Sequence, residues 1–164
     1  MHESASDLAA LDDVLARSAA GAGAHLRAAF DSAAWLSASE LCEALPGIVE
    51  VHLAVLAGDG APLVAPVDGI WFRGGLWIGL PAASLRARLV VRDPRVSVSF
   101  VSDAVSFILH GAFVVAADDA FAAHARSLYV AQYGEWFGEV FDRQTAVGAG
   151  VGGVVEPRVM FAKS

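Results

Sequence analysis

The sequence predicts an antiparallel β-barrel or β-sandwich flanked by helices. Its 164 residues and 17.0 kDa match the size of one domain with one core. From residue 48 onward, valine-rich segments alternate apolar and polar positions and are separated by short turns, as in antiparallel barrels and sandwiches. The first 46 residues have helical spacing instead. We therefore expect an N-terminal helical segment, residues 1–46, and a β domain, residues 47–164, within a single domain overall.

Helices are predicted at three places in the first 46 residues. Ser6 can cap the first helix, which ends at Gly21 and Gly23. Ser37 can cap the third, because Glu40 stands at capping-box spacing, and Pro46 closes it. The apolar residues at helical spacing are Leu8, Leu11, Val14 and Leu15 in the first helix, Leu26, Phe30 and Trp35 in the second, and Leu41 and Leu45 in the third.

Six strands are predicted between turn residues, and five of them come before the last long helix. A short helix, 84–92, interrupts the set and stops before Pro94, because the residue before proline is disfavoured in a helix. Gly111 marks a bulge or a close approach within its strand. The strands are 50–57, 62–72, 76–80, 96–101, 105–116 and 154–162.

A longer helix is predicted after the fifth strand. Asp118 and Asp119 can cap it, and it runs through Tyr129 and Tyr133 towards Trp136 and Phe137. The glycine-rich segment 148–153 is expected to be a flexible loop. Gly148, Gly150 and Gly153 match the spacing of a dinucleotide-binding loop, but no strand precedes them and no crossover helix can follow them.

Composition excludes several classes of protein. The chain is 56% apolar and 18% charged, which excludes intrinsic disorder. Its longest uncharged apolar stretch, 104–117, is too short to span a bilayer, and its acidic N-terminus does not resemble a secretory signal. The single cysteine, Cys42, fits a reducing compartment, and the net charge of -7 disfavours nucleic acid. We expect a cytoplasmic protein without membrane or nucleic-acid partners.

Histidine, cysteine and serine positions indicate neither a metal site nor a hydrolase. The five histidines show no paired ligand spacing, so no metal ligands are assigned. No serine stands in a nucleophile elbow, and Cys42 has no neighbouring cation that would lower its pKa. We interpret Cys42 as a small apolar residue of the core.

Four arginines form a cluster within ten residues of this acidic chain: Arg86, Arg88, Arg92 and Arg95. Ser84 opens the short helix that carries the first of them, and a helix N-terminus with arginines suits a phosphate. The alternative is a solvated helix face that balances the acidic N-terminal segment. The charge pattern alone does not choose between the two.

Three sequence blocks around this cluster resemble the pyridoxamine 5'-phosphate oxidase-like split β-barrel flavoproteins. The blocks are GDGAPLVAPV at 58–67, SLRAR at 84–88 and RDPRV at 92–96, joined by a Gly-Gly hairpin. The family pattern is d-G-x-P-x-x-x-P-V followed by S-x-K-x-R-N-L-x-x-D-P-R-V. The match keeps block order and spacing over residues 48–117. Arg86 replaces the usual lysine, and Leu89 and Val90 replace an Asn-Leu pair.

The resemblance implies a homodimeric, six-stranded antiparallel Greek-key split β-barrel with FMN in a cleft between the subunits. On the matching positions, Val64, Ala65, Pro66 and Val67 would lie beside the flavin ring, and Ser84, Arg86 and Arg88 would hold the phosphate. Trp136 resembles an aromatic residue that relatives bring from the second subunit to the flavin edge. Its alternative role is ordinary helix packing.

The function implied by the resemblance is a flavin-dependent oxidoreductase that acts on a small organic substrate, with residues 47–164 as the flavin-binding domain. Two alternatives stay open: a reductase that uses the deazaflavin coenzyme F-420, and a non-catalytic protein that binds flavin or haem. The C-terminus lacks the R-L-x-P-like ending of true pyridoxamine phosphate oxidases, so vitamin B6 is not the expected substrate. No catalytic acid or base is assigned, and His110 and Tyr129 are the first side chains to screen.

Overall fold

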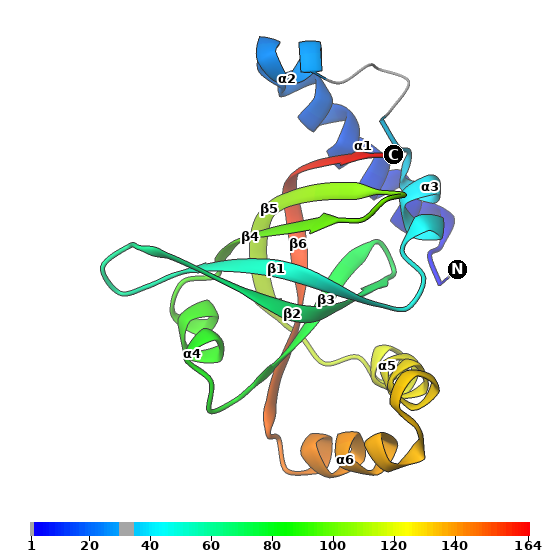
Figure 1. Cartoon of the computed structure of the whole chain (residues 1–164), viewed down its shortest axis with the longest axis vertical. Helices are drawn as coiled ribbons and strands as arrows, with labels where there is room; N and C mark the ends of the chain where they lie inside the picture. Colours follow the sequence, from blue (N-terminus) through cyan, green and yellow to red (C-terminus); the bar gives the residue numbers. More distant parts are fainter. Residues whose placement is uncertain (1, 30–34) are drawn as a thin grey trace.

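A computed structural model describes residues 2–29 and 35–164 and shows a closed six-stranded barrel in which all neighbouring strands are antiparallel (Figure 1). Around the barrel the strand order is β1-β2-β3-β6-β5-β4. This confirms the predicted six-stranded antiparallel barrel with flanking helices. The strands are β1 (Ile48–Leu56), β2 (Pro62–Phe72), β3 (Gly75–Pro81), β4 (Arg95–Val101), β5 (Ser106–Val115) and β6 (Gly150–Lys163).

Six helices accompany the barrel in the described part of the chain. None of them is both long enough and apolar enough to cross a bilayer. Phe30, which the sequence assigns to the second helix, lies outside the described residues. The helices are α1 (Ala5–Gly21), α2 (Ala24–Ala29), α3 (Ala38–Ala44), α4 (Leu85–Arg92), α5 (Asp119–Tyr133) and α6 (Glu135–Ala146).

Side chains alternate between the inside and the outside of the barrel, as the pleat of a strand requires. Leu53 of β1 pairs with Ala65 of β2 on one side and with Val98 of β4 on the other, and all three side chains are buried. The neighbouring positions point outward. The fully buried centre of the barrel includes Val51, Leu53, Val98, Phe107, Leu109 and Met160.

Helix α1 extends this core at one end of β6. Leu11, Val14 and Leu15 are buried in the same cluster as the barrel residues. The buried hydroxyl of Ser18 accepts a hydrogen bond from the Met160 backbone N–H and donates one to the Val14 carbonyl. The N-terminal helix therefore packs directly on the barrel.

The N-cap of α1 is Ser4 and not Ser6, which corrects the sequence prediction. The Ser4 hydroxyl accepts from the Asp7 backbone N–H, and the Asp7 carboxylate accepts from the Ser4 backbone N–H. An acidic residue stands three positions after Ser4, whereas Ala9 stands three positions after Ser6. Only Ser4 can therefore form a reciprocal capping box.

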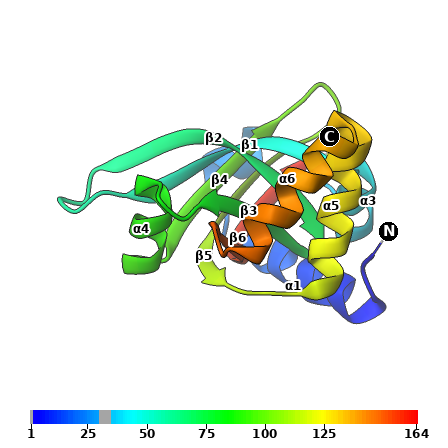
Figure 2. The same cartoon turned by 90° about the horizontal axis from the view of Figure 1, so that it is seen from below.

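Two helices, not one, follow the fifth strand (Figure 2). Asp118 caps α5 as predicted, but α5 ends at Tyr133, and its C-cap Gly134 has a φ of 89°, in the region that favours glycine. The chain then turns into α6, and the Arg126 guanidinium donates to the Asp142 carboxylate across the two helices. The predicted continuous helix through Tyr133 to Phe137 is therefore wrong.

Strand β6 begins at Gly150, four residues before its predicted start at Val154. Gly152 pairs with Gly79 and Gly153 with Ile78 of β3, so most of the predicted flexible loop belongs to the barrel. A side chain at Gly153 would overlap the Val114 carbonyl oxygen. Glycine is needed there for close strand packing.

Candidate functional site

The first turn of α4 is the segment for which the sequence predicts phosphate binding, here called the phosphate-binding element. Ser84 is its N-cap, and the Ser84 hydroxyl oxygen accepts from the Ala87 backbone N–H at 3.1 Å. The remaining backbone N–H groups of this turn are directed away from the helix, as at any helix start. The loop before α4 is held by a hydrogen bond of 2.8 Å from the Ala82 N–H to the Ala149 carbonyl, next to the start of β6.

The four clustered arginines do not form one cationic patch. Arg92 donates to the Leu56 carbonyl of β1 at 3.0 Å, and Arg95 forms an ion pair with Asp93 at 2.6 Å. Arg88 is exposed, and its guanidinium contacts the Ala83 carbonyl at 3.5 Å. No hydrogen bond or ion pair within the described residues engages the side chain of Arg86.

Arg86 and Arg88 leave α4 on different sides. Residues two apart on a helix do not face each other, whereas residues three and four apart do. Arg86 therefore shares its side with the buried Leu89 and Val90, which explains why it is half-buried. Of the predicted cations, Arg86 is the one directed towards the barrel.

The predicted ring-contacting segment of β2 divides between two faces. Val64 and Pro66 point outward, and Val64 is 63% exposed. Ala65 and Val67 pair with Leu53 and Val51 and turn into the barrel. A ligand on the outer surface would therefore meet the side chains of Val64 and Pro66, and only the backbone of the other two.

Trp136 lies at the opposite end of α6 from the phosphate-binding element. Its side chain is 62% exposed and meets the Phe137 ring edge-on at 5.4 Å. The end of α6 that leads to Ala149 lies ten residues further on, about 15 Å at the rise of a helix. Within one chain, Trp136 does not join the start of α4.

The outer surface of β3 and β6 beside α4 carries no side chains at one cross-strand pair. Gly79 pairs with Gly152, and a Cβ at Gly79 would meet no atom within 4 Å. Ser84 stands five positions after Gly79, where a short loop after β3 leads into α4. A flat floor next to a helix N-terminus with a cation without a partner suits a planar ring that carries a phosphate.

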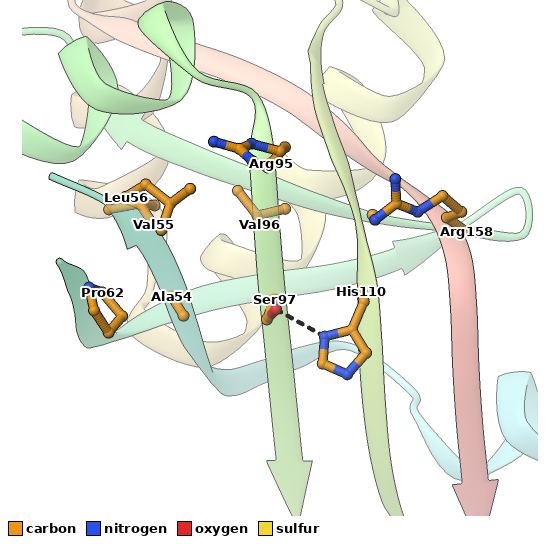
Figure 3. A pocket seen from close by; sticks show the side chains of 10 residues that line it. Ala54, Val55, Leu56, Pro62, Arg95, Val96, Ser97, His110 and Arg158 are labelled. Atoms are coloured by element: carbon orange, nitrogen blue, oxygen red, sulfur yellow. Dashed lines mark hydrogen bonds between the residues drawn. The ribbon is translucent and has the colours of Figure 1, made fainter. Parts of the chain in front are cut away.

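Two hollows lie elsewhere, along the outer face of β4, β5 and β6, and none of the predicted cofactor residues lines either one. The first, of about 280 Å³, is lined by both apolar and polar residues, the latter being Arg95, Ser97, His110 and Arg158 (Figure 3). The second, of about 310 Å³, is mainly apolar and is lined by residues that include Ile108 and Phe161. His110 lines both.

His110 and Tyr129, the two side chains singled out as acid or base, have different surroundings. The His110 Nδ1 is 2.7 Å from the Ser97 hydroxyl, on the outer face. The Tyr129 hydroxyl donates to the Asp68 carboxylate at 3.2 Å, and burial together with that carboxylate raises the pKa of Tyr129. A phenol with a raised pKa and a fixed acceptor is a structural contact rather than an available acid.

Cys42 is half-buried, and burial together with the Glu3 carboxylate raises the pKa of its thiol to about 11. A thiol with such a pKa holds its proton at neutral pH and is a poor nucleophile. This agrees with the sequence-based interpretation of Cys42 as a small apolar residue and not a nucleophile, and Cys42 packs against the core.

Sequence reasoning missed Arg158. His110 pairs with Val159 and Gly111 with Pro157, so Arg158 is the extra residue of a β-bulge in β6. The predicted irregularity at Gly111 is confirmed, because a Cβ there would overlap the Glu156 carbonyl oxygen. Gly111 signals the bulge, but the sequence does not show which residue of the partner strand is left unpaired.

Comparisons with known proteins show similarity of fold. No family model matches the sequence, and no curated protein matches it. Conserved hypothetical protein Rv2991 from Mycobacterium tuberculosis is 17% identical with a TM-score of 0.66, over 82% of this chain and 88% of that one.

Two further solved structures carry functional descriptions. HutZ, the heme storage protein from Vibrio cholerae, is 18% identical with a TM-score of 0.53, over 76% of this chain and 91% of that one. A protein described as F420 reductase is 18% identical with a TM-score of 0.53, over 71% of this chain and 91% of that one. The chain therefore shares the fold of these solved structures, a closed six-stranded antiparallel barrel with flanking helices, which confirms the split-barrel resemblance at the level of the fold.

Proposed function

We propose that the protein is an FMN-binding oxidoreductase that acts on a small organic substrate as a homodimer. The observation that carries this proposal is the start of α4, where the Ser84 cap and the half-buried Arg86 follow, a few residues along the chain, the exposed Gly79–Gly152 pair of β3 and β6. This combination offers hydrogen-bond donors for a phosphate and a flat surface for a ring. It also explains why Arg86 is half-buried without a carboxylate among the described residues.

Ser84 and the two arginines have distinct roles in this proposal. The Ser84 oxygen already accepts from Ala87, so its O–H is free to donate to a phosphate oxygen. Arg86 approaches from the barrel side, and Arg88 folds back over the loop before the helix. When bound, FMN would supply the hydride and electron transfer, and these residues would bind and orient it.

A second chain would complete the site. Val64 and Trp136 are exposed apolar side chains that lie apart in one chain. Pairing of two chains would cover both and bring Trp136 of one chain towards the flavin edge of the other. The solved structure described as F420 reductase has the same fold, which supports a redox coenzyme with a tricyclic ring.

The test uses the purified protein. We expect a flavin spectrum, release of FMN identified by mass, and an increase in unfolding free energy of about 2.7 kcal/mol when FMN is a hundredfold above its Kd. Replacement of both Arg86 and Arg88 by alanine should weaken FMN binding at least about a hundredfold, since each charged contact contributes roughly 1.5–3 kcal/mol.

Arg17→Ala is the matched control, because Arg17 is an exposed arginine on α1. It should leave FMN binding and melting temperature unchanged. A colourless protein whose melting temperature does not respond to FMN would refute the proposal. Unchanged affinity in the double variant would return the two arginines to the role of a solvated helix face.

A deazaflavin reductase or a non-catalytic haem carrier gives different results in the same experiments. Coenzyme F-420 and haem are the two ligands to test beside FMN, because solved structures of similar fold are described as F420 reductase and as a heme storage protein. Release of coenzyme F-420 in place of FMN would identify the reductase. A Soret band, with no turnover for any reductant and acceptor, would identify the haem carrier.

A further inference from the structure

The first hollow sits on one row of outward-facing residues that crosses four strands. Ala54 pairs with Ser97, Ser97 with His110, and His110 with Val159. Residues paired in this way point to the same side of the sheet. Figure 3 shows Arg95 and Arg158 on the strands to either side of the one that carries His110. The floor and the two cationic walls of this hollow therefore come from adjacent strands.

The bulge explains how Arg158 reaches this face. Val159 points outward and Met160 points into the core, so a regular strand would turn Arg158 inward. As the unpaired residue opposite His110 and Gly111, Arg158 is turned to the surface instead. Bulges that re-aim a side chain are concentrated at binding and catalytic sites.

The polar groups of the hollow are hydrogen-bond donors and cations. No described residue forms an ion pair or hydrogen bond with the Arg158 side chain. Arg95 uses its Nε and one terminal nitrogen for the Asp93 carboxylate, which leaves the other terminal nitrogen available. No carboxylate among the residues that the structure describes lines the hollow. This set of groups favours an anion with two or more oxygen atoms.

Ser97 sets the orientation of the third donor. Its hydroxyl is 2.7 Å from the His110 Nδ1. When the Ser97 O–H donates to Nδ1, the imidazole proton is on Nε2, which then becomes a donor on the open side of the ring. Ser97 is therefore a positioning residue for His110.

The second hollow supplies an apolar surface next to this anion site. His110 lines both hollows, and further along the same strands lie Ile108, which is 47% exposed, and Phe161. Ile108 and Phe161 are cross-strand partners on the outer face. A ligand whose anionic group contacts Arg158 can thus place an apolar body over this pair.

We propose that the two hollows bind one organic anion, a carboxylate or phosphate monoester with an apolar body. Arg158 and Arg95 hold the anionic oxygens, His110 Nε2 donates to them, and Ile108 and Phe161 contact the body. Val64 pairs with Ala54, so the same row continues to the residue placed beside the flavin. We identify this anion as the substrate of the oxidoreductase. That identification rests on the proposed function, whereas the anion-binding site itself does not.

The test measures binding in the absence of FMN. Hexanoate, hexyl phosphate and the neutral hexanol are titrated into the full chain, and the ring nitrogens of His110 are followed by NMR. We expect both anions to shift the His110 signals and to bind at least about tenfold more tightly than hexanol, as expected for one charged hydrogen bond. The ratio of the two anion affinities shows which head group the site prefers.

Three variants assign the parts of the site. Arg158→Gln should weaken both anions at least about tenfold and leave hexanol binding unchanged. Ile108→Ala should weaken hexanoate several-fold through lost apolar contact, and leave the binding of inorganic phosphate unchanged. Arg17→Gln, an exposed arginine on α1, is the charge-matched control and should change nothing.

Equal affinity for hexanol and hexanoate, or full affinity in Arg158→Gln, would overturn the inference. The result is independent of flavin binding. If FMN does not bind while Arg158-dependent anion binding persists, the proposed function is lost and the anion site stands. If FMN binds and neither anion does, only the anion site is lost.

Discussion

A single residue, Gly111, determines the geometry of the outer face at the bulge. A methyl group at this position would overlap the Glu156 carbonyl oxygen, which is backbone and cannot move without breaking the bulge. Gly111→Ala should therefore destabilise the fold by roughly 1–3 kcal/mol, the usual cost of overpacking, and lower the melting temperature by several degrees. Differential scanning calorimetry measures this.

Gly21→Ala is the control for that substitution. Gly21 is the last residue of α1, and a Cβ there would meet no atom within 4 Å. The variant should be neutral or slightly stabilising, because alanine favours helix. If both alanine variants melted at the wild-type temperature, the close approach at the bulge would be wrong.

Tyr129 contributes to stability through its protonated form. Its folded pKa is raised above the ordinary value of 10.0 by burial and by Asp68. The contribution is therefore complete below pH 10 and is lost as the pH rises through the folded pKa. Tyr129→Phe should cost about 1 kcal/mol at pH 7, and the alkaline loss of stability should be smaller in the variant.

Absorbance at alkaline pH checks this prediction, since the sequence contains only two tyrosines. The wild type should show one phenol that ionises only when the protein unfolds, and Tyr129→Phe should lack this phase. Two phenols that ionise together at their ordinary pKa in the folded wild type would contradict the hydrogen bond to Asp68.

The stability of helix α3 depends on its capping box. The Ser37 hydroxyl and backbone N–H hold the Glu40 carboxylate and lower its pKa below the ordinary value of 4.5. The stabilisation is present above that value and is lost as the pH falls through the folded pKa. Ser37→Ala should therefore destabilise the protein by about 1 kcal/mol at pH 7 and by less at pH 3.

Urea unfolding at the two pH values measures this difference. Ser39→Ala is the control, because Ser39 lies inside α3 and its hydroxyl donates a hydrogen bond to the Glu43 carboxylate. A Ser37→Ala cost that is the same at both pH values would show that Glu40 takes no part in the cap.

The elements that sequence reasoning predicted well are those whose limits depend on neighbouring residues. Ser37, Ser84 and Asp118 cap their helices as expected, and β2 has its predicted limits. The start of β6 was misplaced because it depends on contacts distant in sequence. Gly150 to Gly153 form a strand only because β3 lies alongside, which local composition does not reveal.

The candidate site was predictable only in part, for the same reason. The cap at Ser84 and the cation at Arg86 follow from local sequence, and the structure leaves both available to a ligand. In the sequence, Arg92 and Arg95 looked equivalent to Arg86. In the structure, however, Arg92 donates to the Leu56 carbonyl and Arg95 forms an ion pair with Asp93. Arg158 is accessible only because of a bulge, whose position depends on how β5 and β6 pair.

A cofactor site shared by two chains would couple FMN binding to the assembly of the dimer. If FMN lies between two chains, dimer formation strengthens FMN binding. FMN binding then strengthens dimer formation by the same factor. Light scattering should then give twice the 17.0 kDa mass of one chain at micromolar concentration. Dilution should lower FMN affinity, and added FMN should restore the dimer. A monomer with an FMN affinity independent of protein concentration would contradict the shared site.

The position of β6 has a consequence for the order in which the barrel is made. β6 lies between β3 and β5, and pairs Leu76 with Val155 and Leu109 with Met160. The ribosome must therefore synthesise this last strand before either neighbour can complete its hydrogen bonds. Until then two open strand edges are exposed, which makes folding slow and the nascent chain prone to aggregation. A chaperone that shields strand edges on the nascent chain should therefore increase the yield of folded protein. The increase should be larger than with a chaperone that acts only after the chain leaves the ribosome.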